Sequence, residues 1–366
     1  MGKQGFVHMI SDEVHKFVTY LEKHSNQPIN IDMLFHRSFI TLIWRIISGD
    51  SLPIGHSTLD TLLKIDQTIL KEAGYNLVMA TLHNDVKISL VCKLGLATMV
   101  QQHSRFLTIM KDTIGIVSTL LYPLVEKVID SIFSEQQKSK GIHEQYHSLT
   151  EALLAKKNDA KGELNPLKGN LGNLNIMNTL LDMVMAGSDT TGCALQWAFT
   201  YMVLYPEIQR KVQLDIENGT DAYIDAVIHE IHRKSKVVAC SVFHAAVEDI
   251  HYKGYVIPKG TYIIPLLGNV MSNPQDFPNP EKFDPERYLS YQNGQLKFTP
   301  HPKVIPFSLG KRRCLGEAIA RSAMKKYLIE VLTHFDLTTN DIIDDQPKPG
   351  YIKGPKHYNI IFTPRF

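Results

Sequence analysis

The feature that most constrains this fold is a long apolar segment near the middle of the 366-residue chain. Residues 174–207 read LNIMNTLLDMVMAGSDTTGCALQWAFTYMVLYPE, with apolar side chains around nearly the whole helical circumference and a stop at Pro206. A helix of this kind buries every face, so it belongs in the core of a large protein. The rest of the chain must therefore supply layers of structure that cover it.

The surrounding segments predict a mainly α fold with small β-sheets. Up to about residue 217 we expect helices, with helical spacing at 11–24, 34–47 and 107–133 and a short helix at 148–157 in the polar loop 135–174. Ser11 or Asp12 looks like the capping start of the first helix. From about 218 to 366 we expect a further helix, hairpin strands at 247–265, a proline-rich loop at 272–304, a cysteine loop with a final helix, and a closing strand. No linker is evident, which predicts one domain over 1–366.

Composition and charge exclude several classes of function. Lys and Arg number 39 and Asp and Glu 37, a balance that argues against nucleic-acid binding. Cys92, Cys193, Cys240 and Cys314 lie far apart without a CxxC pair, which argues against zinc and disulfides and favours a reducing compartment. The N-terminus lacks a signal peptide, and the apolar run 114–125 is too short to span a bilayer. We therefore expect no membrane anchor in the chain as written.

One cysteine lies in the stretch PFSLGKRRCLGEA at 306–318. Cys314 precedes a strong helix pattern, whose free N–H groups would stabilise a thiolate able to bind a metal. Gly310 and Gly316 let the backbone approach a flat cofactor, Arg312 offers a cation to its acidic groups, and Phe307 shields the site from water. The alternative is a buried structural cysteine beside a basic turn.

Polar residues interrupt the long apolar helix at AGSDTT, residues 186–191. Thr190 follows Ala186 by four positions, so its hydroxyl can compete for the Ala186 carbonyl and loosen the helix beside Gly187. Such an opening makes room for a small ligand next to Asp189. The alternative is a helix kink with a satisfied threonine.

Two further motifs contain charged residues. Glu230 and Arg233 in EIHR are three residues apart and share one helix face, and PERY at 285–288 contains Arg287. A solvated surface pair is the usual alternative for an isolated ExxR.

These four motifs follow one another along the chain as AGSDTT, EIHR, PERY and the cysteine loop. Together they resemble the cytochrome P450 superfamily, whose patterns A/G-G-x-D/E-T-T, ExxR, PERY and FxxGxRxCxG they match. The style of 201–213 and 254–265 is similar to animal microsomal P450s of the drug- and steroid-hydroxylating group. The resemblance implies a P450 fold that lacks the N-terminal anchor and first helices and strands. It departs from the family in two places: Trp44 is followed at plus four by Ser48, so the WxxxR helix is missing, and the connection within 207–230 is short. Both indicate a truncated or diverged chain.

The resemblance implies haem b bound by Cys314 and a monooxygenase that inserts one oxygen atom from O2 into a small lipophilic substrate. Thr190 and Asp189 would serve proton delivery, beside the groove at Ala186. Arg312 and His244 would meet the haem propionates, and Glu230, Arg233 and Arg287 would form a structural charge network. The residues that would contact substrate are Leu181, Asp182, Met185, Val237, Val238, Tyr351 and Ile352.

Because no flavin or dinucleotide fingerprint is present, electrons would come from NADPH–cytochrome P450 reductase at the endoplasmic reticulum membrane, on its cytosolic face. A basic face would receive this partner through Lys303, Lys311, Arg313, Lys325 and Lys326. Two alternatives stay open, a truncated haem-binding fragment without activity and a helical interaction protein with coincidental motifs.

Overall fold

The computed structural model describes residues 3–51, 146–159, 165–242 and 244–366. The chain forms two compact units, with the boundary inside its longest helix. Unit 1 takes residues 1–23 and 30–192, and unit 2 takes residues 24–29 and 193–366. The predicted helix at 107–133 and the apolar run at 114–125 lie outside the described residues.

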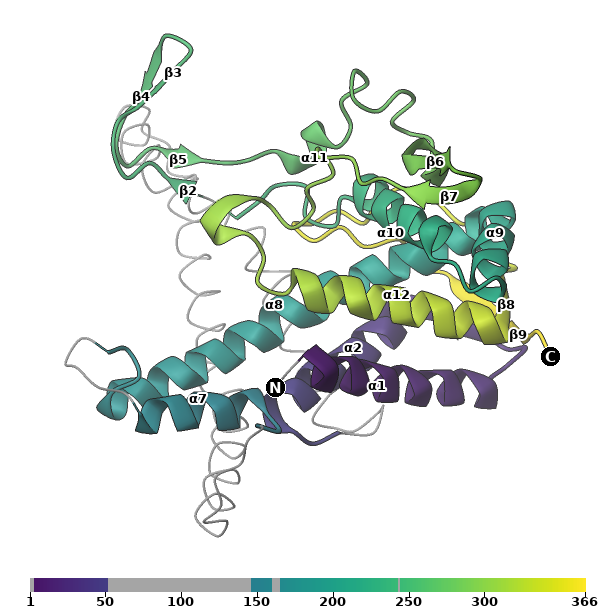
Figure 1. The fold of residues 1–366 in the computed structure, drawn as a ribbon, viewed down its shortest axis with the longest axis horizontal. Coiled ribbons are helices and arrows are strands. Elements are labelled where there is room, and N and C mark those ends of the chain that lie inside the picture. The colour runs from purple at the N-terminus through teal and green to yellow at the C-terminus, as the bar shows by residue number, and fades with distance from the viewer. Residues whose placement is uncertain (1–2, 52–145, 160–164, 243) are drawn as a thin grey trace, which may run out of the picture. The chain divides into compact units, whose positions relative to one another are not determined.

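Unit 1 is built from helices α1 (Lys3–Lys23), α2 (Ile31–Ser48), α7 (Leu149–Asn158) and the first part of α8 (Figure 1). The capping start predicted at Ser11 or Asp12 was wrong, because α1 begins eight residues earlier. Asp12 instead pairs with Arg45 of α2 at 2.8 Å, and the buried Glu13 contacts the same guanidinium at 3.2 Å. These carboxylates serve a helix–helix contact rather than a cap.

The ends of α2 and α7 follow from local side chains. The Asn30 side chain accepts the Asp32 N–H at 2.8 Å at the start of α2, and Gly49, at φ 83°, ends this helix. Ser148 accepts the Glu151 N–H at 3.0 Å and starts α7, which confirms the short helix predicted at 148–157. Thr150 donates to the Ile47 carbonyl at 2.8 Å and so ties α7 to α2.

The predicted central helix is confirmed as α8 (Gly169–Leu204). It begins a turn earlier than the apolar pattern does and ends just before Pro206, whose ring cannot continue it. Every residue from 191 to 202 is buried, in keeping with the all-round apolar sequence. The part before residue 191 alternates exposed and buried positions.

Unit 2 packs three helices together, α9 (Pro206–Glu217), α10 (Ala222–Ser235) and α12 (Glu317–His334) (Figure 1). The short helix α11 (Leu267–Val270) and the 3-10 turn η3 (Pro285–Tyr288) lie near α10, where Leu267, Met271, Phe277 and Tyr288 form a buried cluster with Ala226. A second 3-10 turn, η4 (Gly310–Arg312), precedes α12. The segment that contains Cys314 runs from β7 (Gln295–Phe298) to α12, and both of these elements contact α10.

The strands of unit 2 form small antiparallel pairs. Strands β2 (His244–Ala245) and β5 (Tyr262–Ile263) enclose a hairpin of β3 (Ile250–Tyr252) and β4 (Tyr255–Ile257), as predicted. Strands β8 (Phe335–Thr338) and β9 (Asn359–Pro364) pair beside β1 (Pro28–Asn30) in the order β1-β9-β8. The described chain is thus mainly helical with small sheets, which is the predicted class.

The loop predicted over 272–304 was wrong in its second half. Strands β6 (Leu289–Gln292) and β7 (Gln295–Phe298) form a hairpin there. Its turn residues Asn293 and Gly294 both have positive φ, 52° and 77°, which is the geometry that Asn-Gly favours between two strands. Among the described helices, none is long and apolar enough to cross a membrane.

Candidate functional site

Cys314 lies in unit 2, exposed, two residues before the Gly316 cap of α12. Its backbone N–H donates to the Phe307 carbonyl at 2.9 Å and closes the loop. Inside the loop Ser308 and Gly310 both have positive φ, 61° and 79°. Such a backbone is costly for serine and is held by its surroundings. Cys314 therefore lies at the end of a loop that a backbone hydrogen bond closes, two residues before the N-cap of α12 and its free N–H groups.

Phe307 anchors this loop between two side chains. The His232 ring of α10 meets the Phe307 ring edge-on, with centroids 5.1 Å apart, and the Arg321 guanidinium of α12 lies 4.9 Å from the same ring. Burial, and then the charge of Arg321, lowers the pKa of His232 to about 3. His232 is consequently neutral, and its Nε2 finds no hydrogen-bond partner within the part of the chain that the structure describes.

Behind the loop, Glu230 and Arg233 form a fully buried ion pair on α10. Two guanidinium nitrogens donate to the two carboxylate oxygens at 2.7 and 2.8 Å, and both side chains have no exposed area. Arg233 also donates to the backbone carbonyls of Met271 and Lys282, each at 3.1 Å. Burial alone would lower the pKa of Arg233, but the bonds to Glu230 outweigh it and raise that pKa. Arg233 thus stays charged and ties α10 to the segment after α11.

The PERY turn meets the same carboxylate. Arg287 Nε lies 3.4 Å from Glu230 Oε1, the Tyr288 hydroxyl donates to Oε2 at 2.7 Å, and the Asp284 N–H donates to Oε1 at 2.9 Å. Burial, and then the charge of Glu230, raises the pKa of Tyr288 above its usual value. Glu230 is therefore the centre of the network, and it joins α10 to the turn η3.

Thr190, Asp189 and Ala186 belong to α8 within unit 1. The Thr190 hydroxyl donates to the Ala186 carbonyl at 2.8 Å, which is the hydrogen bond that the sequence predicts. The backbone stays α-helical through these residues, so the helix is not interrupted there. Asp189 contacts His36 of α2, with Oδ1 2.7 Å from Nε2. Ala186 is exposed, whereas Thr190 and Asp189 are partly buried.

The two residues predicted to meet acidic cofactor groups differ in setting. Arg312 is exposed in the turn η4, next to Lys311 and Arg313. His244 lies in β2, opposite Ile263 of β5, and is half-buried. The His244 Nδ1 is buried without a hydrogen-bond partner among the described residues.

Two of the segments predicted to contact substrate come together in unit 2. The Lys353 N–H donates to the Val237 carbonyl at 2.8 Å, and Trp197 of α8 donates to the Lys353 carbonyl at 2.7 Å. This ties the turn of Tyr351 and Ile352 to the segment of Val237 and Val238, all four half-buried. In unit 1, Asp182 is exposed and Met185 half-buried on α8, while the side chain of Leu181 lies outside the described residues.

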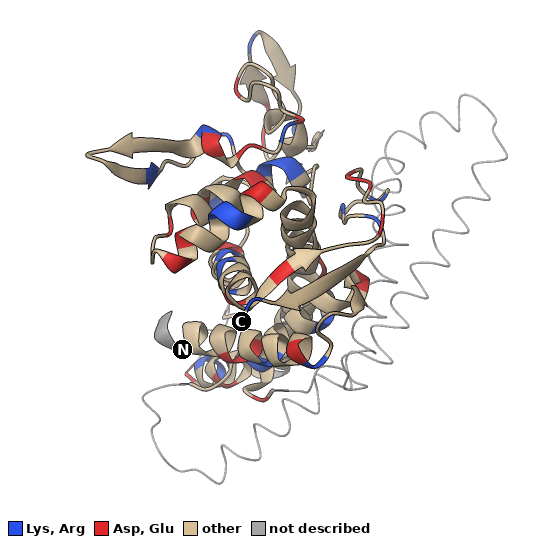
Figure 2. Cartoon of the chain, turned by 90° about the vertical axis from the view of Figure 1, so that its right-hand side faces the viewer, with Lys and Arg blue, Asp and Glu red and all other residues tan. Residues whose placement is uncertain are grey.

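The five basic residues predicted to form a face are not equally available. Lys303 pairs with Asp276 at 2.5 Å, Lys325 with Asp225 at 2.7 Å, and Lys326 with Glu330 at 2.6 Å. The remaining two, Lys311 and Arg313, are exposed on the cysteine loop. Figure 2 shows acidic and basic residues interleaved along the described helices. Of the five predicted residues, those on the cysteine loop are therefore the most accessible to a partner.

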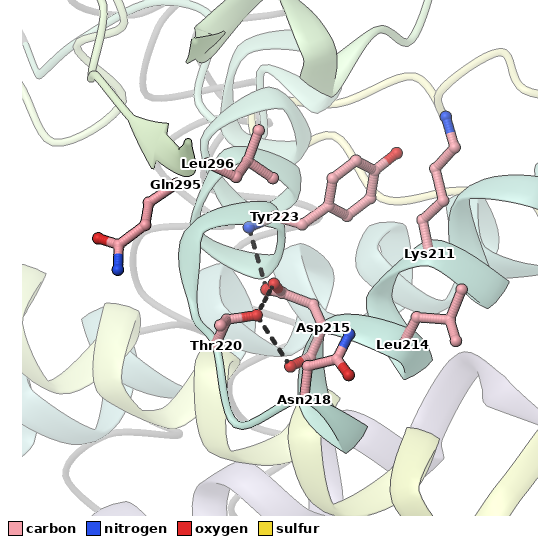
Figure 3. Close-up of a pocket in the computed structure, with 8 residues that line it drawn as sticks. All are labelled: Lys211, Leu214, Asp215, Asn218, Thr220, Tyr223, Gln295 and Leu296. Carbon is pink, nitrogen blue, oxygen red and sulfur yellow. Dashed lines mark hydrogen bonds between the residues drawn. The ribbon is translucent and has the colours of Figure 1, made fainter. Parts of the chain in front are cut away.

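A pocket of about 490 Å³ between α9, α10 and β7 has a different character (Figure 3). Its buried Asp215 accepts the backbone N–H groups of Tyr223 and Ile224, each at 3.0 Å, and the Thr220 hydroxyl. These are the free N–H groups at the start of α10. Asp215 therefore caps α10, the helix that contains Glu230. The acidic residue of this pocket thus serves the structure through these hydrogen bonds.

Three contributors escaped the sequence reasoning. His36 and Asp189 are far apart in the chain, and nothing in the local sequence of α2 indicates their contact. His232 reads as an ordinary position inside EIHR, and only tertiary packing brings it to Phe307. Tyr288, by contrast, is the last letter of PERY, so its place beside Arg287 was a usable signal.

Comparison with known proteins places these motifs in context. The family model described as Cytochrome P450 matches residues 1–362. Cytochrome P450 2C3 of Oryctolagus cuniculus is 39% identical over 207 residues, covering 52% of this chain and 42% of that protein. Cytochrome P450 2E1 of Sus scrofa is 36% identical over 208 residues, with 52% and 41% covered, and Cytochrome P450 2C8 of Homo sapiens is 35% identical over 207 residues, with 52% and 42% covered. The match thus spans less than half the length of these relatives.

Proposed function

The chain belongs to the cytochrome P450 family, a family of haem-thiolate enzymes that bind haem b, and from that premise we propose that it is a monooxygenase. It would insert one oxygen atom from O2 into a small lipophilic substrate. The observation that carries this proposal is the exposed Cys314 in a loop closed onto Phe307 at the start of α12.

The residues of unit 2 fit a haem on three counts. Cys314 offers a sulfur donor, and a thiolate there would be stabilised by the free N–H groups of α12. Gly310 has no heavy atom within 4 Å of the place where a Cβ would be, so its backbone is open to an approaching cofactor. The orphaned Nδ1 of His244 and the exposed Arg312 suit acidic groups such as propionates.

When bound, a haem iron with a thiolate ligand supplies the activation of O2, because the thiolate favours O–O cleavage. The chain's own residues do the rest. Cys314 would hold the iron, and its thiolate charge would be balanced by the N-terminus of α12. Arg312 and His244 would orient the cofactor through hydrogen bonds to its carboxylates. The buried network around Glu230 would keep α10 rigid behind the loop, so that Phe307 stays in place.

On α8, Thr190 and Asp189 would hold and move protons. Reduction of O2 to one inserted oxygen atom and one water consumes two protons and two electrons, so proton supply must be organised. The Thr190 hydroxyl, which donates to the Ala186 carbonyl, still has lone pairs that accept a further bond. Leu181, Asp182, Met185, Val237, Val238, Tyr351 and Ile352 would contact the substrate.

Electrons would come from NADPH–cytochrome P450 reductase, docked at the exposed Lys311 and Arg313. Since Lys303, Lys325 and Lys326 are engaged in ion pairs, they would contribute less steering than their number suggests. By family resemblance, the protein would act at the cytosolic face of the endoplasmic reticulum membrane.

A reduced carbon-monoxide difference spectrum tests the proposal. The wild-type protein should give a Soret band at about 450 nm, as expected for a thiolate-bound haem. Cys314→Ala should abolish this band, whereas the matched thiol variant Cys240→Ala should keep it. A wild-type band at about 420 nm would favour a haem-binding fragment without activity. The absence of any band would refute haem binding.

A further inference from the structure

The contact between His36 and Asp189 limits where the protons of the two side chains can lie. Both residues belong to unit 1, His36 on α2 and Asp189 on α8, and their side chains are 6% and 14% exposed. His36 Nε2 lies 2.7 Å from Asp189 Oδ1, and Nδ1 lies 2.8 Å from the Asp32 carbonyl oxygen one turn back. The imidazole is thus held at both nitrogens.

The backbone carbonyl decides the tautomer. A carbonyl oxygen only accepts, so Nδ1 must carry a proton and donate it to Asp32. The 2.7 Å contact at Nε2 then needs one more proton between nitrogen and oxygen. It lies either on Nε2, giving an imidazolium with a carboxylate, or on Oδ1, giving a neutral imidazole with a carboxylic acid. In either arrangement the pair holds one proton beyond the neutral imidazole and the free carboxylate.

Close packing keeps this pair in place. A Cβ at Gly192 would lie 2.8 Å from His36 Cδ2 and 3.2 Å from His36 Cα, and one at Gly187 would lie 2.9 Å from Ile43 Cδ1. Real Cβ atoms do not approach within 3.0 Å, and the His36 ring and backbone cannot both move away, so Gly192 is needed for α2 to lie this near α8. At Gly187 the nearest atom is the end of the Ile43 side chain, which can turn aside. The missing side chain at Gly192, three residues after Asp189, therefore leaves room for the His36 ring beside the carboxylate.

We propose that His36 is a positioning residue that holds the Asp189 carboxyl and keeps a transferable proton in the Nε2–Oδ1 contact, next to Thr190. The inference rests on the proposed monooxygenase function and deepens it. In each turnover the pair would release its proton toward the oxygen being reduced, the Nε2–Oδ1 contact would lose that proton, and solvent would restore it through the partly exposed Asp189. Electrons come from NADPH, so the step needs no further reactant.

A comparison of His36→Leu with His36→Gln tests the role. Leucine removes the contact, whereas the glutamine amide can still donate to Asp189 Oδ1 but carries no acidic proton. With reductase and NADPH, and without substrate, we expect His36→Leu to slow NADPH oxidation about 10- to 100-fold and to alter the solvent deuterium isotope effect. This loss reaches at most the lower end of the roughly 10²- to 10⁴-fold that a positioned acid contributes, because Asp189 itself remains. His36→Gln should recover part of the rate but keep the altered isotope effect. Thr41→Val, on the same helix, is the matched control and should change neither quantity.

A second measurement does not depend on turnover. Nitrogen-15 NMR of the carbon-monoxide complex, and of the haem-free protein, should show a slowly exchanging imidazole N–H signal that is lost in His36→Gln and exchanges faster in Asp189→Ala. A wild-type protein without the band at about 450 nm would refute the proposed function. The imidazole signal of the haem-free protein would then still decide whether His36 holds the proton. A normal band in His36→Leu together with wild-type rate and isotope effect, or absence of the protected signal, would refute the role of His36.

Discussion

The buried network around Glu230 allows a stability prediction to be worked from its contacts. Glu230→Gln keeps the shape of the side chain but removes the charge that faces Arg233, which has no exposed area and donates two hydrogen bonds to that carboxylate. Breaking a buried pair by removing one charge costs about 3–5 kcal/mol, because the remaining charge stays desolvated. The ratio of folded to unfolded protein should fall about 10²- to 10⁴-fold.

The assay uses the only two tryptophans of the chain, Trp44 in unit 1 and Trp197 in unit 2. In a Trp44→Phe background, Trp197 fluorescence during urea unfolding reports on unit 2. The double variant Glu230→Gln with Arg233→Met removes both charges and should lose less stability than the sum of the two single variants.

The half-exposed pair of Lys326 and Glu330, four residues apart on α12, provides the control, since breaking a helical pair of this spacing costs about 0.5 kcal/mol or less. The reasoning fails if Glu230→Gln costs no more than this control, or if the two single variants are strictly additive.

Three other predictions concern unit 2. The pKa of His232, lowered to about 3 from an ordinary 6.5, means that the unfolded chain gains a proton below about pH 6.5 that the folded chain refuses. The stability present above pH 6.5 should therefore fall on the order of 1.4 kcal/mol per pH unit toward pH 3, and His232→Phe should flatten that slope in urea unfolding at several pH values. Asp215→Ala should cost about 1–2 kcal/mol by removing the cap of α10, measured as a shift in the urea midpoint; an unchanged midpoint would contradict the capping role. Gly294→Val should destabilise the β6–β7 hairpin by about 1–2 kcal/mol because φ is positive there, whereas Gly316→Ala, with a helical φ and only an ordinary contact, should cost less than half as much.

Sequence spacing predicted the parts of this protein that depend on near neighbours. A spacing of three positions places Glu230 and Arg233 on one face of α10, and a spacing of four brings the Thr190 hydroxyl to the Ala186 carbonyl. The Asn293–Gly294 turn was equally readable, and the proline count of its segment hid it. Such features depend on helix and turn geometry alone.

The proton-holding pair and the state of the basic residues were decided by tertiary structure. His36 meets Asp189 because Gly192 on α8 leaves room for α2 to approach, and Lys325 is paired because α10 and α12 pack together. Asp12 likewise lies inside α1 and pairs with Arg45 of another helix, a partner that its local sequence does not indicate. Motifs record chemistry that is local in the chain, so the sequence by itself determined the family and the cysteine loop. Contacts between residues of different helices depend on how the helices pack. That packing depends on residues from many parts of the sequence, so no single segment predicts it.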